Sequence, residues 1–400
     1  MNKAARPTML VMLSTAILVL VLLTACGSEN RNALSENDGL VYEDINDTTV
    51  DEFLIEAEIQ PPTYTAFEAD DELSITTYFS RIDFDAIDFA SMIMPISASH
   101  GYIGHWYVRH ISTYLPSRVP FTYRELDAAL WLEQMLLAKG FNEPQVRLQT
   151  FAYYDVLDWE DYFGWGVPSG RHAVKQQGWH EGHEMREYSQ NIIVTIPGQS
   201  AQTIIIGAHY DSLRYSGASD NASGTALLLE SAQRMLAKDS YYTLVYVFFG
   251  AHEVGLLGTF YFYESLSPEE RESIVLYINA DVLIEGPDLL VSSGYNFRLS
   301  ANAISERASS IAESFYNSHQ IIFHQPHITG GDQLLFLYKG HTTLAFWGAE
   351  FYPIFNTNFL HSHRDSYEYI SNRFPGMIER AMNAFALLLE AVLLDIKYSN

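Results

Sequence analysis

Five residues along this chain stand in short sequence contexts that suit metal ligation. Two are histidines and three are carboxylates, in the segments IIIGAHYDS, GASDNASG, FFGAHEVGLLG, INADV and FLHSHRDS: His209, Asp220, Glu253, Asp281 and His361. Imidazole and carboxylate are common zinc ligands, and one bridging carboxylate would let the five hold two ions with a shared water. Water activated in this way is a nucleophile, so the set predicts a hydrolase.

Apolar segments precede most of these residues and would position them. The stretches TIIIGAH, TLVYVFF and SIVLYINA each end at a candidate ligand or shortly before one. Such runs are typical of strands buried on both faces of a sheet, and open α/β sheets place their sites at the carboxyl ends of strands. Any one of the five alone is more often structural, as Asp220 would be at a helix N-terminus. Together, at successive strand ends, they indicate one site.

Two neighbouring residues refine the expected site. Asp211 lies two residues beyond His209, where its carboxylate could accept the second ring N–H of that histidine and fix its tautomer. Asp281 would be an unpaired buried carboxylate at a strand end, which is costly unless a metal is bound. In LHSHRDS we prefer His361 over His363 as the ligand.

The strand and helix signals predict an α/β fold. The expected strands QNIIVTI, TIIIGAH, TLVYVFF and SIVLYINA alternate with helical segments, which indicates a three-layer α/β/α sandwich around a mixed, mostly parallel sheet. We expect one domain over residues 73–400. Its last helix should run from about residue 374 to 397 and pack on the sheet, because the charged side chains along it disfavour a membrane span.

The segments GAHYDS, SDNASG, AHEVGLLG, NADV and HSHRDS resemble, in order and spacing, the motifs of the co-catalytic dizinc exopeptidases of peptidase family M28, which include bacterial leucyl aminopeptidases and aminopeptidase Y. The similarity covers roughly residues 105–395, including a later segment with Asp332. The resemblance implies that His209 and Asp281 hold one zinc and that Glu253 and His361 hold the other. It also implies that Asp220 bridges the two ions, with Asp211 and Asp365 as supporting residues.

One position departs from the family pattern. The residue before the zinc-binding glutamate is itself a glutamate in the family, where it acts as the general base, but here it is His252. Imidazole can transfer protons because its ordinary pKa of about 6.5 is close to the useful range. Beside two zinc ions, however, this pKa should fall, and the ring could become an extra ligand that closes the open coordination position.

The first residues predict export and lipid attachment. MNKAARPTMLVMLSTAILVLVLLTAC has a positive start, an apolar run and a lipobox that ends at Cys26, so residues 1–26 are expected to be a lipoprotein signal peptide. Cys26 is the single cysteine of the sequence, which excludes an internal disulfide. Residues 27–72 are acidic and lack a sustained periodic pattern, as expected of a tether. We therefore expect a lipid-anchored protein of the cell envelope, outside the cytoplasm.

An insertion at about residues 153–186 is rich in aromatic side chains. These could form a wall of the substrate cleft or simply pack the loop. The segment also contains HEGHE, with His180 and His183, but its spacing differs from the helical H-E-x-x-H zinc motif. We therefore interpret HEGHE as a solvated loop.

The net charge of the chain excludes some classes of binding partner. The formal net charge is −26, and it becomes −28 when Lys3 and Arg6 leave with the signal peptide. This excess of negative charge excludes nucleic acid and disfavours anionic membrane surfaces, so the lipid would be the means of attachment. Peptides are the expected substrates, and the oligomeric state stays open.

Three functions are compatible with these features. The first is an aminopeptidase with two Zn²⁺ ions that acts on extracellular peptides, with His252 or a water chain moving protons. The second is a metal-binding relative that binds peptides without hydrolysing them, as a lipoprotein. The third is an acyl transferase that resembles glutaminyl cyclase, which shares the fold but uses a single zinc. The presence of all five ligand positions argues against the third.

Overall fold

The computed structural model describes residues 82–152, 186–213, 215–295, 303–319, 321–323, 331–350 and 359–396. All of them belong to one compact unit, residues 59–400. The predicted signal peptide with Cys26, the tether of residues 27–72 and the insertion up to residue 185 lie outside the described residues, so those expectations stay predictions.

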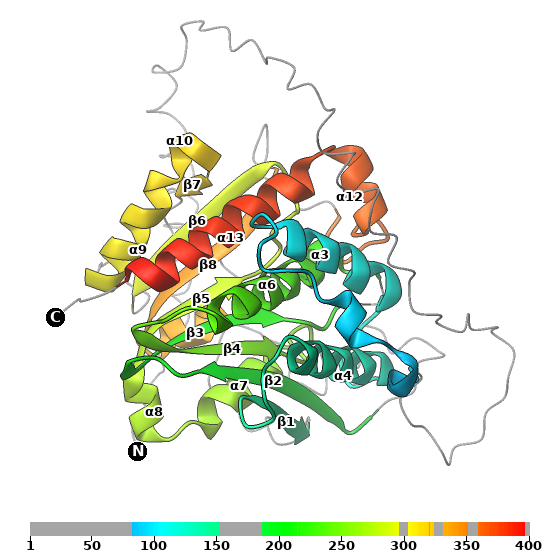
Figure 1. Cartoon of the computed structure of the whole chain (residues 1–400), viewed down its shortest axis with the longest axis horizontal. Coiled ribbons are helices and arrows are strands. Elements are labelled where there is room, and N and C mark those ends of the chain that lie inside the picture. Colours follow the sequence, from blue (N-terminus) through cyan, green and yellow to red (C-terminus); the bar gives the residue numbers. More distant parts are fainter. Residues whose placement is uncertain are drawn as a thin grey trace, which may run out of the picture. The chain divides into compact units, whose positions relative to one another are not determined.

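A mixed sheet of eight strands lies at the centre of the described part of the chain (Figure 1), in the order β1-β2-β4-β3-β5-β8-β6-β7. The strands are β1 (Val146–Ala152), β2 (Tyr188–Ile196), β3 (Ser200–His209), β4 (Tyr242–Phe249), β5 (Ile274–Ala280), β6 (Asp288–Tyr295), β7 (Ile321–Phe323) and β8 (Thr342–Ala349). The pairs β4–β3, β3–β5, β5–β8 and β6–β7 are parallel. The pairs β1–β2, β2–β4 and β6–β8 are antiparallel.

Helices cover both faces of the sheet. They are α3 (Tyr102–Tyr114), α4 (Tyr123–Ala138), α6 (Gly224–Leu236), α7 (Leu257–Ser265), α8 (Pro268–Ser273), α9 (Ala303–Ser314), α10 (Tyr316–His319), α11 (Gln333–Tyr338), α12 (Tyr367–Arg373) and α13 (Met377–Asp395). Shorter turns are η1 (Phe84–Ala86), η2 (Phe89–Met92) and the π-helical turn η4 (Ala218–Ser223).

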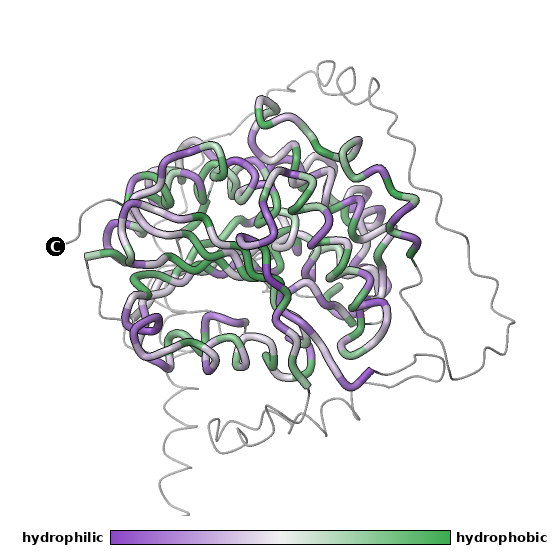
Figure 2. The backbone as a smooth tube through the Cα atoms, turned by 60° about the horizontal axis from the view of Figure 1, so that its bottom comes forward, coloured by the Kyte–Doolittle hydropathy of each residue, from purple (hydrophilic) through white to green (hydrophobic). Residues whose placement is uncertain are grey.

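Two hydrophobic cores fix this layering, because successive residues of a strand point to opposite faces. In β3, Ile204 and Ile206 lie in the core built with α3, α4, α6 and α13. Ile205 lies in a second core, built with α7 and α11. Figure 2 shows the hydrophobic residues gathered along the central strands. The predicted three-layer sandwich with a mixed, mostly parallel sheet is confirmed.

One connection differs from the expected alternation of strands and helices. Residues 197–199, which include Pro197 and Gly198, join β2 to β3 without a helix, and β2 runs antiparallel to β4. A proline–glycine pair favours a turn, and three residues are too few for the crossover that neighbouring parallel strands require. The chain therefore reverses its direction between β2 and β3, and β4 lies between these two strands in the sheet.

The final helix is three residues shorter at its start than expected, since α13 begins at Met377. Within the described residues, no helix combines the length and the apolar character that crossing a bilayer would need. The parallel strands β3, β4 and β5 have their carboxyl ends at one edge of the sheet. The candidate ligands follow at this edge.

Candidate metal centre

The five predicted ligands converge at the carboxyl edge of β3, β4 and β5. The Nε2 atom of His209 lies 3.1 Å from Asp220 Oδ1 and 3.2 Å from Asp281 Oδ1. The Nε2 atom of His361 lies 3.0 Å from Asp220 Oδ2 and 3.3 Å from Glu253 Oε2. Asp220 thus divides its two oxygens between two groups of side chains, as a bridging carboxylate would.

The donor atoms of this cluster fit a divalent metal ion. Among the described residues, Glu253 Oε1 is buried without a hydrogen-bond partner, and His209 Nε2 and Asp281 Oδ1 are buried 3.2 Å apart without the geometry of a hydrogen bond. Leaving such atoms unpaired costs free energy, and a metal ion at this point would remove the cost. The mixture of imidazole nitrogen and carboxylate oxygen suits zinc. Among the residues that the structure describes, two sets of three have ligand atoms within 4.8 Å of one another: His209, His252 and Asp281 in one, and Asp220, Glu253 and His361 in the other.

Each candidate ligand lies where the local fold places it. His209 is the last residue of β3 and Asp281 follows β5 directly, as predicted. Asp220 lies in η4, immediately before α6, and Glu253 lies in the turn after β4. His361 has a left-handed backbone with a φ of 55° and its side chain is 49% exposed, whereas His363 belongs to neither of the two ligand sets.

Without metal, protons on the imidazoles balance the carboxylates. Burial lowers the pKa of His209, but Asp281 and the other carboxylates around it raise this pKa well above its ordinary value. Hydrogen bonds to Asp220 and Glu253 raise the pKa of His361 to about 11. Burial raises the pKa of Asp220, but the two histidines lower it below its usual range. Protons and metal therefore compete for the same atoms.

The competition predicts a pH dependence of stability. In the metal-free fold, burial and His209 lower the pKa of His252, but Asp332 and Asp281 raise it from 6.5 to about 9. Its proton therefore stabilises the fold fully below about pH 6.5, and this contribution is lost as the pH rises through about 9. We expect the Tm of chelator-treated protein to fall across this window. Zinc displaces protons, so the increase in Tm that zinc produces should grow with pH.

Thermal unfolding with and without zinc, at several pH values across that window, measures both effects. A zinc-induced increase in Tm that shrinks as the pH rises would contradict the assignment of His209 and His361 as ligands.

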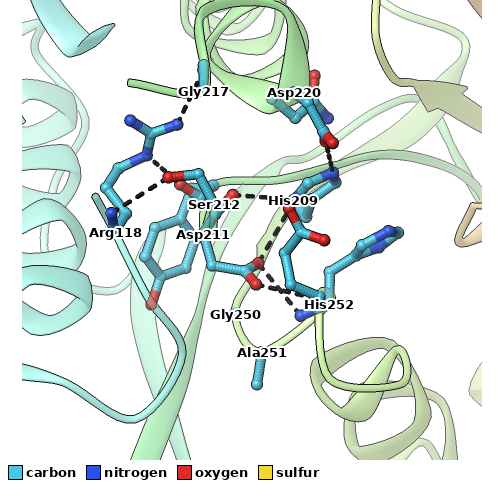
Figure 3. A network of polar contacts seen from close by, with 12 residues as sticks. Arg118, His209, Asp211, Ser212, Gly217, Asp220, Gly250, Ala251 and His252 are labelled. Atoms are coloured by element: carbon cyan, nitrogen blue, oxygen red, sulfur yellow. Dashed lines mark hydrogen bonds and ion pairs between the residues drawn. The ribbon is translucent and has the colours of Figure 1, made fainter. Parts of the chain in front are cut away.

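The turn that carries His252 and Glu253 is held by buried side chains (Figure 3). Four successive backbone N–H groups, from residues 250 to 253, each donate a hydrogen bond to one of them. The acceptors are, in order, Asn191 Oδ1 at 3.1 Å, Glu125 Oε1 at 2.9 Å, Asp211 Oδ1 at 3.1 Å and Asp211 Oδ2 at 3.0 Å. Hydrogen bonds to each successive amide therefore fix the backbone that carries the candidate ligand Glu253.

Asp211 supports the site differently from the sequence-based expectation. The ring Nδ1 of His209 makes its hydrogen bond, at 3.1 Å, to the main-chain oxygen of Asp211. The nearer carboxylate oxygen of Asp211 lies 3.5 Å from that nitrogen. Both carboxylate oxygens accept hydrogen bonds from the amides of His252 and Glu253. One residue thus orients the histidine through its backbone and the turn through its side chain.

His252 has its own carboxylate partner. Its Nδ1 lies 3.1 Å from Asp332 Oδ1, an oxygen that also accepts a hydrogen bond from the hydroxyl of Thr259. This contact leaves Nε2 as the ring nitrogen free for chemistry. The expected fall of the His252 pKa beside two cations is therefore opposed by the negative charge of Asp332.

The ring of His252 stacks flat on the ring of His209, with 3.8 Å between their centroids and 7° between their planes. Two imidazoles bound to one tetrahedral ion diverge from it at about 109°, which places their centres farther apart. Although a nitrogen of His252 lies within reach of the His209 and Asp281 ligand atoms, this stacking favours a role beside the metal. It does not favour the closure of the coordination shell by His252.

The turn η4, which carries Asp220, is held by Asp365. Its Oδ1 accepts a hydrogen bond from the amide of Ser219 at 2.6 Å, and its Oδ2 accepts one from the amide of Asp220 at 3.1 Å. The resemblance implied a supporting role for Asp365, and these contacts are of that kind. Burial and the neighbouring Asp220 raise the pKa of Asp365 to about 7.

The loop between His209 and η4 is fixed by the buried guanidinium of Arg118 (Figure 3). Its nitrogens donate to the main-chain oxygens of Tyr210 at 2.6 Å, Ser216 at 2.9 Å and Gly217 at 3.0 Å. Gly217 has a φ of 56°, and a side chain there would collide with Asp220 and Arg118. The path of the chain between the two ligands is thus determined by backbone contacts.

A small cavity of about 10 Å³, enough for about one water molecule, adjoins the second ligand set. Its lining combines candidate ligands with residues of the loop before η4: Leu213, Tyr215, Gly217, Asp220, Glu253, His361 and Asp365.

Three of the supporting residues, Glu125, Asn191 and Arg118, were not found from the sequence. None of them stands in a metal-binding motif, and the groups that they hold near the candidate ligands are distant along the chain.

Comparison with known proteins agrees with this geometry. Residues 191–386 match the model of peptidase family M28. The alkaline phosphatase isozyme conversion protein of Escherichia coli (strain K12) is 26% identical over 241 residues, which are 56% of this chain and 64% of that protein. The probable lipoprotein aminopeptidase LpqL of Mycobacterium tuberculosis is 38% identical over 98 residues, 24% of this chain and 20% of that protein. The chain thus matches less than two thirds of the length of these relatives.

Solved structures share the fold at low sequence identity. A zinc aminopeptidase from Bacillus subtilis superposes with a TM-score of 0.58 at 16% identity, covering 76% of this chain and 97% of that one. A glutaminyl cyclase from Tannerella forsythia superposes with a TM-score of 0.55 at 16% identity, covering 75% of this chain and all of that one, 100%. The match over residues 191–386 assigns this part of the chain to peptidase family M28, and the described residues have an aminopeptidase-like fold.

Proposed function

We propose that the chain is a zinc-dependent aminopeptidase that hydrolyses N-terminal residues of extracellular peptides. The observation that supports this most strongly is the division of the two Asp220 oxygens between two histidine–carboxylate groups. A site of this kind can hold two metal ions close together, as co-catalytic hydrolases require.

In this proposal two zinc ions share the site. His209 and Asp281 would hold one, Glu253 and His361 would hold the other, and Asp220 would contribute one oxygen to each. When bound, the ions supply a polarised substrate carbonyl and a water of lowered pKa. His252 takes a proton from the attacking water and returns one to the leaving amine.

Supporting residues keep this machinery in place. Asp332 orients His252 through Nδ1, so that the free ring nitrogen is Nε2. Asp211 holds the amides of His252 and Glu253, and Asp365 holds the turn of Asp220. Each of these carboxylates accepts hydrogen bonds from groups that carry ligands or the base, which limits their movement during the reaction.

A substrate panel tests the reaction. Zinc-loaded protein is incubated with aminoacyl anilides, with the same anilides acetylated at the amine, and with peptides blocked at the N-terminus but free at the C-terminus. We expect release only from substrates with a free N-terminal amine. Release from the C-terminal side would instead indicate a carboxypeptidase.

A second candidate, a peptide-binding lipoprotein without hydrolysis, is favoured by one observation, the histidine at position 252. It predicts zinc-dependent peptide binding without product in the same panel. The third, glutaminyl cyclisation, draws on the fold that solved cyclases share. It predicts ring closure of peptides with N-terminal glutamine. A site with a single zinc ion would not explain why His209 lies beside both Asp220 and Asp281.

The proposed location is the outer side of a membrane, with the lipid on Cys26 as the anchor. The basis is the lipobox at the end of the apolar N-terminal run. Labelling of expressing cells with a radioactive fatty acid tests this proposal, because a membrane-bound wild type without label, or a Cys26→Ser variant with as much label, would contradict it.

A further inference from the structure

We infer that Glu125 is a positioning residue of the proposed metal centre, holding the turn that presents His252 and Glu253. Glu125 lies in the first turn of α4, is completely buried, and belongs to neither ligand set. Its Oε1 accepts hydrogen bonds from the amide of Ala251 at 2.9 Å and from Ser189 Oγ at 2.7 Å. Its Oε2 accepts one from the amide of Phe121 at 2.6 Å. One carboxylate thus connects α4, β2 and the turn after β4.

The contact with Ala251 lies where the backbone of that turn has an unfavourable conformation. Ala251 is fully buried and has a φ of 51°, in the left-handed region that residues with a side chain rarely adopt. If Glu125 were lost, the buried N–H of Ala251 would have no acceptor in place, which costs about 1–3 kcal/mol. The turn can relieve this cost only by moving, and the ligand Glu253 lies two residues further on.

The hydrogen bonds on either side of Ala251 show why the loss of Glu125 should weaken metal binding. Asn191 holds the amide before Ala251, and Asp211 holds the two amides after it. Removal of Glu125 therefore releases the middle of a short turn whose ends stay fixed. Residues that orient metal ligands through such contacts typically change metal affinity or activity 10- to 100-fold when they are replaced.

Glu230 offers a matched control within the same fold. It is also completely buried, and it accepts hydrogen bonds from the amides of Gly101 at 2.8 Å and Gly104 at 2.5 Å and from Arg234 at 2.8 Å. These contacts join α6 to the start of α3. None of them involves the turn of residues 250–253, so a variant of Glu230 reports stability alone.

The experiment compares Glu125→Ala, Glu125→Gln and Glu230→Gln in the full chain. Three quantities are measured: the zinc dissociation constants against a competing chelator, the Tm of the metal-free protein, and hydrogen exchange of a peptide that covers residues 250–256. For Glu125→Ala we expect the zinc ion held by Glu253 to bind about 10- to 100-fold more weakly, with faster exchange in the turn. Glu125→Gln keeps an oxygen for Ala251 and should restore most of the affinity.

Glu230→Gln should lower the Tm while both zinc affinities and the exchange of the turn stay as in the wild type. The inference is overturned if Glu125→Ala behaves in the same way, with a lower Tm as its only effect. If Glu125→Ala does not fold, Glu125→Asp replaces it: the shorter side chain cannot reach both Ala251 and Phe121, so unchanged zinc affinities and exchange would again overturn the inference.

The inference rests on the proposed function, but the two can fail separately. A wild-type chain that binds no zinc would contradict the proposed function, while exchange in the turn would still report the role of Glu125. A wild-type chain that binds two zinc ions, with Glu125→Ala equal to it in affinity and exchange, would contradict the inference alone.

Discussion

Replacement of Asp220 by asparagine is expected to remove zinc-dependent turnover and to weaken the binding of both metal ions. Asp220 Oδ1 faces His209 and Oδ2 faces His361, so it is the residue that the two ligand groups share. An amide has one oxygen in place of two and no charge, so it cannot serve both groups. We expect kcat/KM to fall by at least about 10²-fold, because the loss of an outer supporting partner alone costs 10- to 100-fold.

The measurement is zinc content after dialysis, together with kcat/KM on an aminoacyl anilide. Asp239→Asn provides a control, since Asp239 is exposed beyond the far end of α6. If the Asp220→Asn variant keeps two tightly bound zinc ions and normal turnover, Asp220 does not bridge the two ions.

Replacement of His252 by glutamate is expected to raise turnover by up to about 10²–10⁴-fold, the usual contribution of a well-placed general base. A carboxylate carries the negative charge that helps to retain a proton beside two cations, whereas the imidazole depends on Asp332 for that charge. The flat stacking on His209 also constrains where the imidazole can point. Glutamate has no such stacking constraint.

His252→Gln is the matched control, because glutamine has the size of glutamate but cannot accept a proton in this range. Turnover of one anilide by zinc-loaded wild type, His252→Glu and His252→Gln shows whether the histidine limits the reaction as a general base. If glutamate brings no gain over the wild type, the histidine is not the feature that limits the reaction. If glutamine brings the same gain as glutamate, the histidine acts by obstruction and the base lies elsewhere.

The candidate ligands could be placed at one site from the sequence because their positions follow from local structure. His209 and Asp281 stand at the ends of apolar strands, and parallel strands bring their carboxyl ends to one edge of the sheet. The antiparallel placement of β2 was harder to predict, since a strand that is buried on both faces shows no sign of its direction.

The supporting residues could not be found in this way. Arg118 acts on main-chain oxygens about a hundred residues later, and a backbone acceptor leaves no pattern of residue types in the sequence. Glu125 resembles an ordinary helix-start carboxylate, because its bond to the amide of Phe121 is local. Its contact with Ala251 depends on how α4 packs against the sheet, which only the folded chain shows.

The link between His252 and Asp332 belongs to the same class. The two residues are eighty positions apart, and neither segment indicates the other. From the sequence, His252 lacked the negative charge that a glutamate would carry. In the structure, the carboxylate of Asp332, in contact with the ring of His252, supplies that charge. A histidine held by an aspartate is a familiar arrangement for moving protons.

The central claim is that this chain hydrolyses peptides at a two-metal centre. Its most direct test is a zinc titration of metal-stripped protein, from which bound zinc and amine release from aminoacyl anilides are recorded at each step. The account predicts two bound zinc ions per chain, with amine release that appears as the ions bind. Two bound ions without release on any anilide would contradict it and leave a peptide-binding protein with a metal centre.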